Sequence, residues 1–473
     1  MVVGLSCRIG SPRTQLAIRK GFLTMASPSP AIKAADLLDL FEELLPPSEL
    51  EKFDVGHARI FTAWMVVWLM VYQRTRKDEP MSAAVAEMLF GATSTRLPDC
   101  KRARDEDISA NTGAYSQARS DLPVTAAVHA TDVTSRTMIN TEPPTWNGRR
   151  TFLFDGSSVT TGHYPELVDR FPPATNQHGP SHWPVIRMVE AHELSSGLAI
   201  RPCYGPMYGP DAVSETDLAR QMLSQLGGPA MIVYDRNFGI FAMTYAAVEA
   251  GHDVLVRMTD PRFGALLSQA VPIGPGEWTV EWRPSRWDRL KNPGLPADAV
   301  VRGRLIEVSV EHEGKTIVLR LFTTDMTSTP KELAALYARR WSVEGDIKSV
   351  KQTLGMDRLS CRTVEMVEKE IPLAMVAYNL VIQIRRLAAR RVGVEPRQLS
   401  FKRILHLAQA FCSGLGSART AEEIEQRFER LLKAAAQCRL PRRKKFRSYP
   451  RQIIPRGRKF PERPREILNI NTK

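Results

Sequence analysis

Short strand-like runs alternate with helix-like runs from residue 150 onward, and this alternation constrains the fold more than any other feature of the chain. TFLFD (151–155) and MIVYD (231–235) are continuous apolar runs of the kind that form buried strands. Each run ends in an aspartate, Asp155 and Asp235, directly before turn residues. Alternating strands and helices predict a mixed α/β sheet. If the second strand lies parallel beside the first, the two aspartates become neighbours.

Turn and capping signals predict the other elements of this region. PVIRMVEAHEL and GLAIRPC are predicted to be strands joined by the turn SSG. The pair Ser214 and Asp217 has the spacing of a capping box, which predicts a helix through Leu226 that Gly227 and Gly228 terminate. IFAMTYAAVEAG is the next predicted helix and DVLVRM the next strand. The predicted order is therefore β-β-β-α-β-α-β.

The segment YARRWSVEGDIKSVKQTLG carries a second pattern, Tyr-x2-Arg-x3-Glu-x6-Lys. On one α-helix its polar residues would share a face, because their offsets follow the helical repeat. A second stripe at helical spacing is apolar and would face the core. Such a polar face suits the joint binding of a divalent metal and phosphates. The polar stripe comprises Tyr337, Arg340, Glu344, Lys348 and Lys351, and the apolar stripe Val343, Ile347, Val350 and Leu354.

This pattern resembles the signature of the DDE transposases of bacterial insertion sequences, specifically the insertion-sequence-four family. The resemblance covers roughly residues 40 to 465 and includes the two strand-end aspartates. It implies an RNase H-like catalytic core that binds two Mg²⁺ ions, for which Mn²⁺ is a possible substitute. Asp155, Asp235 and Glu344 are then both the catalytic residues and the metal ligands, with Asp155 in the bridging position.

The chemistry of phosphodiester cleavage agrees with three carboxylates in one site. Two metal ions about 4 Å apart stabilise both the attacking and the leaving oxygen. Hard carboxylate oxygens are the ligands that Mg²⁺ prefers. The alternative is that each aspartate caps a turn, in DGSS and DRNFG.

Four residues are candidate DNA ligands: Tyr337, Arg340, Lys348 and Lys351. Arg340 is the strongest of them, since the guanidinium fork matches phosphate oxygens. For the lysines the alternative is a solvated helix face.

The function implied by the resemblance is cut-and-paste transposition. The protein would bind the inverted ends of its element, cleave them, and join the 3′-OH ends to target DNA. A hairpin intermediate and a homodimer on DNA are implied by the family alone. Two alternatives remain open, a metal-dependent DNA nuclease on the same core and a DNA-binding protein without catalysis.

The charge of the chain also favours DNA as a partner. The 473 residues carry a net charge of +14, with a pI near 9.6. Residues 439–465 hold twelve Lys or Arg against one acid, so about +3 is left for the rest. Arginine-rich segments with interspersed aromatic residues bind nucleic-acid backbones, whether or not they fold.

The remaining segments complete the predicted organisation. EWTVEWR, RLIEVSV and KTIVLRLFTT predict a β-rich insertion that does not belong to the catalytic sheet. Its tryptophans, Trp278, Trp282 and Trp287, are core residues unless one of them stacks on an unpaired base. The predicted divisions are a basic extension (1–35) with a transit-peptide-like composition or a start codon placed upstream of Met25, a helical DNA-binding domain (36–122), an RNase H-like catalytic core in two segments (123–258 and 327–364) with the insertion (259–326) between them, a helical region (365–438) and a basic tail (439–473).

Other features argue against competing classes of protein. Six scattered cysteines without a C-x-x-C pair favour a reducing compartment, and the predicted location is the bacterial cytoplasm at the nucleoid. The apolar run 61–73 is too short for a membrane span and predicts a buried helix. His178 and His182 have metal-compatible spacing but no supporting acids, and no phosphate-binding loop implies a nucleotide cofactor.

Overall fold

The fold is described from a computed structural model. It covers residues 36–54, 60–77, 79–141, 143–176, 179–312, 315–415 and 420–441, together with a two-residue strand at Cys7–Arg8. The described residues up to Leu440 form one compact unit. The predictions for the basic extension and for nearly all of the basic tail fall outside the described residues. The predicted domain boundaries stay predictions.

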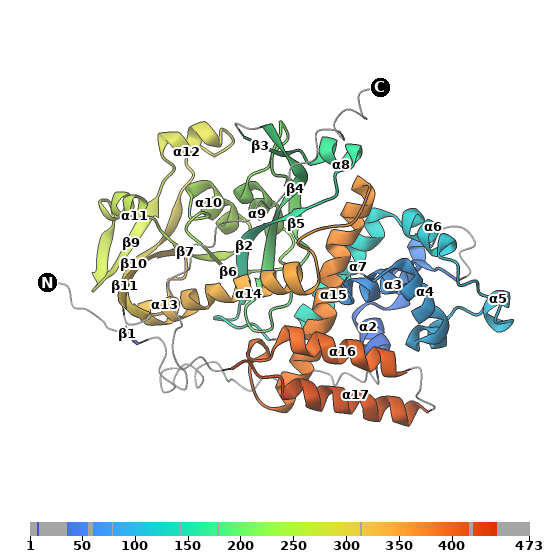
Figure 1. The fold of residues 1–473 in the computed structure, drawn as a ribbon. Coiled ribbons are helices and arrows are strands. Elements are labelled where there is room, and N and C mark those ends of the chain that lie inside the picture. The colour runs from blue at the N-terminus through green and yellow to red at the C-terminus, as the bar shows by residue number, and fades with distance from the viewer. Residues whose placement is uncertain are drawn as a thin grey trace, which may run out of the picture. The chain divides into compact units, whose positions relative to one another are not determined.

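One mixed sheet runs through the molecule in the order β3-β4-β2-β6-β7-β11-β10-β9-β8, with β5 paired to β4 and β1 to β10 (Figure 1). The strands β2, β6 and β7 are parallel, and β4 runs antiparallel to β2. The predicted RNase H-like mixed sheet flanked by helices is confirmed. The strands are β1 (Cys7–Arg8), β2 (Arg150–Thr160), β3 (Pro173–Asn176), β4 (Gly179–Glu193), β5 (Cys203–Pro206), β6 (Ala230–Tyr234), β7 (Asp253–Arg257), β8 (Val271–Gly274), β9 (Glu277–Trp282), β10 (Val301–His312) and β11 (Lys315–Thr323).

Two strand boundaries differ from prediction. Strand β2 does not end at Asp155 but continues to Thr160, because β4 pairs with it over that whole length. The predicted strand GLAIRPC (197–203) is not formed as such, since β5 begins at its last residue, Cys203, and continues to Pro206. Ahead of β5, the Asn379 side chain bonds both the N–H and the C=O of Ala199, so these groups are not available for a regular ladder.

The insertion is rich in strands as predicted, but the prediction that it lies outside the catalytic sheet is wrong. Strand β11 pairs antiparallel with β7, and β10, β9 and β8 follow from it. Leu321 and Ile306 belong to the same buried cluster as Leu255 of β7. The insertion therefore extends one continuous apolar face.

The two faces of the sheet are covered by different helices. Residues at odd-numbered positions of the central strands, such as Leu153 and Val233, pack under α13 (Pro330–Ala338) and α14 (Ser342–Lys348). Their even-numbered neighbours face the other side, where α9 (Glu215–Leu223) and α10 (Phe241–Glu249) pack. Figure 1 shows α13 and α14 following one another across the sheet.

A helical layer flanks this sheet and is built around α15 (Val364–Arg391). Helices α7, α3 and α17 pack on α15. The apolar run 61–73 is α3, buried as predicted. The other helices are α2 (Leu37–Leu44), α3 (Ala63–Thr75), α4 (Met81–Phe90), α5 (Lys101–Arg104), α6 (Gly113–Asp121), α7 (Val124–Asn140), α8 (Pro165–Arg170), α11 (Asp260–Leu267), α12 (Arg286–Lys291), α16 (Phe401–Leu415) and α17 (Ala421–Ala436).

Within the described residues, α15 alone has the length and apolar composition of a membrane span. However, 94% of its apolar window is buried inside the protein. It also carries the buried cations Arg385 and Arg386. Its neighbours in the fold are other helices, so it packs as the core helix of this layer.

Candidate active site

The sheet places the two predicted aspartates side by side. Strands β2 and β6 are parallel, with Leu153 opposite Val233. Continuing this register by two residues sets Asp155 level with Asp235, on strands that lie about 4.8 Å apart. Because side chains alternate along a strand, both aspartates point toward the face covered by α13 and α14. The predicted parallel arrangement of TFLFD and MIVYD is confirmed.

Glu344 lies in the first turn of α14, above this face. The prediction of one regular helix from Tyr337 to Lys351 is wrong, since a 3₁₀ turn (Arg339–Trp341) precedes α14 and a π-helical turn (Ser349–Thr353) follows it. The apolar stripe nevertheless packs as predicted, with Val343, Val350 and Leu354 fully buried and Ile347 partly buried. The π turn brings the Lys351 ammonium to the carbonyl oxygen of Ser158 on β2, to which it donates a hydrogen bond.

Arg340 links the strand carboxylate to the helix carboxylate. Its guanidinium lies 3.6 Å from the Asp155 carboxylate and 3.3 Å from that of Glu344. Only 7% of Arg340 is exposed, and the guanidinium also lies over the Trp341 ring, 4.9 Å from its centroid. The residue predicted to bind phosphate is therefore held between two of the predicted metal ligands.

The charges of Asp235 and Glu344 both act on Asp155. The pKa of the Asp155 carboxyl is raised to about 6, chiefly by burial and to a smaller extent by these two negative charges. Arg340 and the N–H of Gly156 act in the opposite direction. A buried carboxylate beside two others is in deficit of positive charge, which a bound cation would supply.

The donor chemistry of these three carboxylates fits a hard divalent cation. Over the ranges that the structure describes, no three acidic, histidine or cysteine side chains lie close enough to share one ion. Glu344 is about half exposed and pairs with Arg340. The structure thus gathers the carboxylates on one face but leaves them separated by the Arg340 guanidinium.

Tyr337 and Arg257 complete this face. Tyr337 is 5% exposed, and burial raises the pKa of its hydroxyl to about 12, with Arg340, Arg257 and Asp235 among its charged neighbours. Arg257 ends β7, and the β6–β7 register sets it level with Asp235. The sequence analysis missed Arg257, although its place at the end of the strand after MIVYD was a usable signal. Lys348 is exposed and lies further along the same segment.

A buried carboxylate that sequence reasoning also missed lies directly across from Asp155. Glu190 of β4 is the cross-strand partner of Asp155 and is 1% exposed. It accepts a hydrogen bond of 2.9 Å from the Ser157 hydroxyl, and its other oxygen lies 3.4 Å from Nε2 of His192. Nδ1 of His192 faces the carbonyl oxygen of Gly197, which only accepts, so Nδ1 carries a hydrogen.

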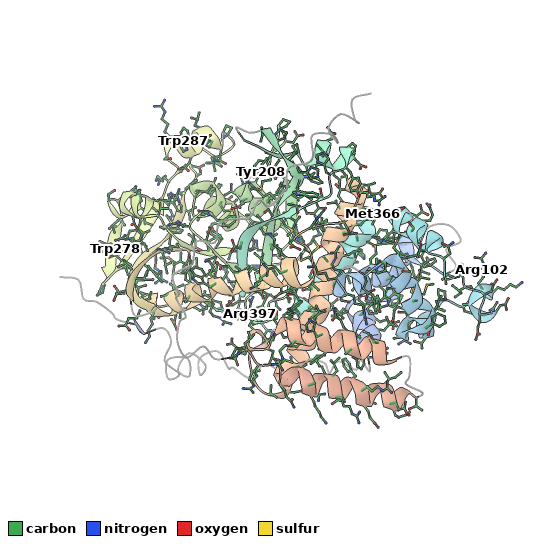
Figure 2. All side chains as sticks on the ribbon, in the orientation of Figure 1. Arg102, Tyr208, Trp278, Trp287, Met366 and Arg397 are labelled. Atoms are coloured by element: carbon green, nitrogen blue, oxygen red, sulfur yellow. The ribbon has the colours of Figure 1, made fainter. Side chains whose placement is uncertain are left out.

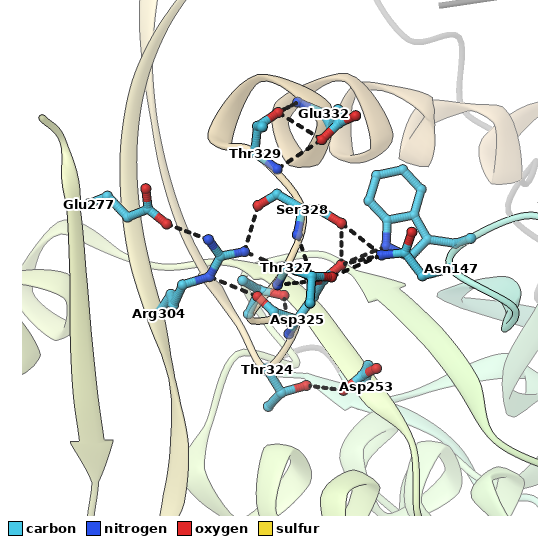
Figure 3. Close-up of polar contacts among 12 residues, drawn as sticks. Asn147, Asp253, Glu277, Arg304, Thr324, Asp325, Thr327, Ser328, Thr329 and Glu332 are labelled. Atoms are coloured by element: carbon cyan, nitrogen blue, oxygen red, sulfur yellow. Dashed lines mark hydrogen bonds and ion pairs between the residues drawn. The ribbon is translucent and has the colours of Figure 1, made fainter. Parts of the chain in front are cut away.

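A polar cluster around Asp325 fixes the start of α13, the helix that carries Tyr337 (Figure 3). The Asp325 carboxylate accepts hydrogen bonds from Trp146 Nε1 at 2.8 Å and from Ser328 N at 2.9 Å, and these interactions lower its pKa. Arg304 of β10 donates to the carbonyl oxygens of Asp325 and Ser328 and pairs with Glu277 of β9. These contacts hold strands β9 and β10 of the insertion and the start of α13 together around Arg304 and Asp325.

The three tryptophans of the insertion differ in burial. Trp282 is 4% exposed and packs edge-on against Phe241 and Phe322. Trp278 is partly buried against Phe263. Trp287 is 63% exposed on α12 with the Lys291 ammonium over its ring (Figure 2). Trp287 is thus the member of the three that is open to a ligand.

Asp346 lies two residues after Glu344 but is paired with an arginine outside the candidate site. Asp346 is 4% exposed and forms an ion pair with Arg397, which also donates to the carbonyl oxygens of Leu194 and Glu193. His178 lies outside the described residues. His182 stacks on His163 rather than joining an acidic cluster.

The chain is similar to known proteins of one family. Residues 146–380 match the family model described as "Transposase DDE domain". The chain is 29% identical over 397 residues to "Transposase InsG for insertion sequence element IS4" of Escherichia coli (strain K12), an alignment that covers 82% of this chain and 84% of that protein. The family match includes Asp155, Asp235 and Glu344.

Proposed function

The chain belongs to the DDE transposases of the insertion-sequence-four type, and from this premise we propose that it is a Mg²⁺-dependent DNA transposase that cuts and pastes its own element. The observation that supports the proposal is the placement of Asp155 and Glu344 on the Arg340 guanidinium, with Asp235 near enough for its charge to raise the pKa of Asp155. An ion pair with only a structural role needs one carboxylate for its one arginine. Further carboxylates on the same face favour a site that binds metal cations.

In this proposal Asp155, Asp235 and Glu344 would hold two divalent cations. When bound, these ions stabilise charge on the attacking and leaving oxygens of the phosphodiester. Arg340, which contacts two of these carboxylates, would bind a phosphate oxygen of the DNA end. Its stacking on Trp341 keeps the guanidinium plane near the site.

The remaining side chains of the face position the DNA. Lys348 and Lys351 bind backbone phosphates beside the cleaved bond, and the Tyr337 hydroxyl donates to one of them. Arg257 adds a cation level with Asp235. Trp287 is available for stacking on an unpaired base, in agreement with its exposure. Positioning of this kind supplies a large part of the rate in phosphoryl transfer.

The proposed substrate is the pair of inverted DNA ends of the element, and the products are 3′-OH ends joined to target DNA. Two copies of the chain act together on the two ends, in the bacterial cytoplasm. The alternative is a nuclease that cleaves by the same carboxylates without joining. It differs in a single outcome, because it yields nicked ends and no joined product.

The decisive experiment is incubation of the full chain with its end DNA and Mg²⁺, with nicks, hairpins and joined products scored separately. Asp235→Asn should abolish all three and leave end binding near normal, because it removes a metal ligand while keeping the side-chain shape. Asp211→Asn is the matched control on an exposed acid. Full nicking by Asp235→Asn would refute the assignment of the carboxylates.

A further inference from the structure

A group of rings and guanidiniums outside the candidate active site lies where β2 ends. The His163 and His182 rings stack with centroids 4.5 Å apart and planes 9° from parallel, and Trp183 meets His182 edge-on at 4.4 Å. The Arg358 guanidinium lies 4.2 Å from the centre of the Trp183 ring, and that of Arg362 lies 5.7 Å from the Tyr164 ring. We call His163, Tyr164, His182, Trp183, Arg358 and Arg362 the ring surface.

The ring surface is open to solvent and yet fixed in place. His163, His182, Arg358 and Arg362 are exposed, and Trp183 and Tyr164 are partly exposed. Nδ1 of His163 donates a 2.6 Å hydrogen bond to the carbonyl oxygen of His182, which sets the ring orientation. Exposed rings that are held stacked are pre-organised for contact with another planar or extended group.

The backbone ties this surface to both halves of the candidate active site. Thr160 of β2 bonds to the segment after the π turn, through Asp357 O and Leu359 N at 3.2 and 2.8 Å. Thr160 lies five residues beyond Asp155 on the same strand, a distance of about 17 Å. That distance corresponds to about five base pairs along a DNA duplex, at about 3.4 Å each.

Among the described residues, no acidic side chain pairs with the cations of this region. Within the described stretches of the chain, Arg358 and Arg362 form no ion pair, whereas Arg304 and Arg397 elsewhere pair with buried acids. A neighbouring acid, Glu166, already accepts a 2.9 Å hydrogen bond from the N–H of Val364. An arginine pair that is held by rings and left without carboxylates fits phosphates of a partner.

We propose that the ring surface is a second DNA contact of the protein, which grips the duplex of the element end about half a helical turn from the cleaved phosphate. The proposal rests on the proposed function for the identity of the DNA. Arg358 and Arg362 bind two backbone phosphates, and the stacked rings pack against the sugars and base edges between them. The proposed row of DNA-binding cations begins at Lys348 and Lys351 and continues beyond the π turn to Arg358 and Arg362. It therefore leads away from Glu344 along one duplex.

The test is binding of end DNA to the full chain without divalent metal, over a range of salt concentrations. The double variant Arg358→Ala/Arg362→Ala should weaken binding about tenfold or more at moderate salt, and reduce the slope of log affinity against log salt by up to about 1.8. Arg403→Ala, an exposed arginine on α16, is the matched control and should change neither. His163→Ala should weaken binding without changing the slope, because it removes a ring and no fixed charge.

Position along the DNA is tested with uncharged methylphosphonate linkages. Placed four to seven base pairs from the cleavage site, they should weaken wild-type binding and leave the double variant unaffected. Placed elsewhere, they should affect both proteins equally. An unchanged salt slope in the double variant, or weakened binding seen only with target DNA that lacks the element end, would overturn the proposal.

The outcome is separable from that of the proposed function. At saturating DNA and Mg²⁺ the double variant should still nick end DNA, because its substitutions leave all three carboxylates in place. If the wild-type chain binds end DNA through this surface but never nicks it, the contact stands and the catalytic proposal fails. If nicking is normal but the double variant binds as the wild type does, only the contact is refuted.

Discussion

Asp155 is a carboxylate whose charged form the fold disfavours. Its pKa is about 6 in the folded chain, against an ordinary value of 3.8, and burial is the main cause. Because this pKa is raised, the ionised Asp155 carboxylate lowers the free energy of unfolding. This loss of stability is full above about pH 6, decreases as the pH falls, and vanishes below about pH 3.8. We therefore expect Asp155→Asn to stabilise the metal-free protein at pH 8 by up to about 3 kcal/mol.

Thermal or denaturant unfolding at pH 8 and at pH 4 checks this expectation. The stability gain of Asp155→Asn should shrink toward zero at the lower pH, where the native carboxyl is neutral as well. Asp211→Asn, on an exposed residue, should give no gain at either pH. A decrease of stability at pH 8 would mean that the Arg340 contact outweighs burial.

We expect Arg340 to weaken metal binding and to promote cleavage of the DNA end. Its charge lies 3.6 and 3.3 Å from two of the proposed ligands, so Arg340→Ala should strengthen Mn²⁺ binding by the free protein, measured by electron paramagnetic resonance. The same change should reduce end cleavage ten- to hundredfold, since a charge-assisted contact is worth about 1.5 to 3 kcal/mol. Arg340→Lys should restore only a fraction of the cleavage, because an ammonium cannot make the two-pronged contact. Wild-type cleavage in both variants would indicate a purely structural arginine.

At the scale of elements, local patterns predicted the strands and helices better than their partners. TFLFD and MIVYD were identifiable because a short unbroken apolar run before an aspartate and a turn has few alternatives. Strand β11 was identifiable too, but its pairing with β7 was not, because it depends on a contact between residues far apart in sequence. The same limit hid Glu190 and Arg257, which join the site only through sheet register. The 3₁₀ and π turns on either side of α14 could not be predicted, because the apolar residues of this segment keep the spacing of one continuous helix.

The insertion strands give a prediction that separates packing from DNA contact. Trp282→Ala should destabilise the fold by about 3 to 5 kcal/mol, since it empties a buried site between Phe241 and Phe322. Trp287→Ala should leave the unfolding midpoint unchanged and instead lower cleavage of end DNA, because its exposed ring has little to pack against. Denaturant unfolding and cleavage assays on both variants test this. Equal cleavage by Trp287→Ala and wild type would show that the ring does not stack on DNA.

At the scale of the whole molecule, the helices of the helical layer are held to one another by partly buried charge pairs as well as by apolar packing. Arg74 of α3 and Arg119 of α6 both pair with Glu370 of α15, at 2.6 and 3.2 Å. No periodic pattern in one sequence points to such a pairing, because each partner lies on a different helix. The sequence did identify the helices themselves and the uneven charge of the chain. The helices of this layer are therefore predictable from the sequence, but the charge pairs that join them are not.

The uneven charge gives the last prediction. Near the end of the described residues, the N–H of Leu440 bonds to the carbonyl oxygen of Gln398, so a truncation should begin after Pro441 to leave that hydrogen bond intact. Residues 442–473 hold twelve Lys or Arg against two Glu, a net charge of +10. Their removal should weaken end binding and reduce the slope of log affinity against log salt by about 0.9 for each phosphate that is no longer bound. A full-length variant with these cations changed to Gln should behave like the truncation, which separates charge from chain length. An unchanged salt slope in both proteins would show that the segment does not touch DNA.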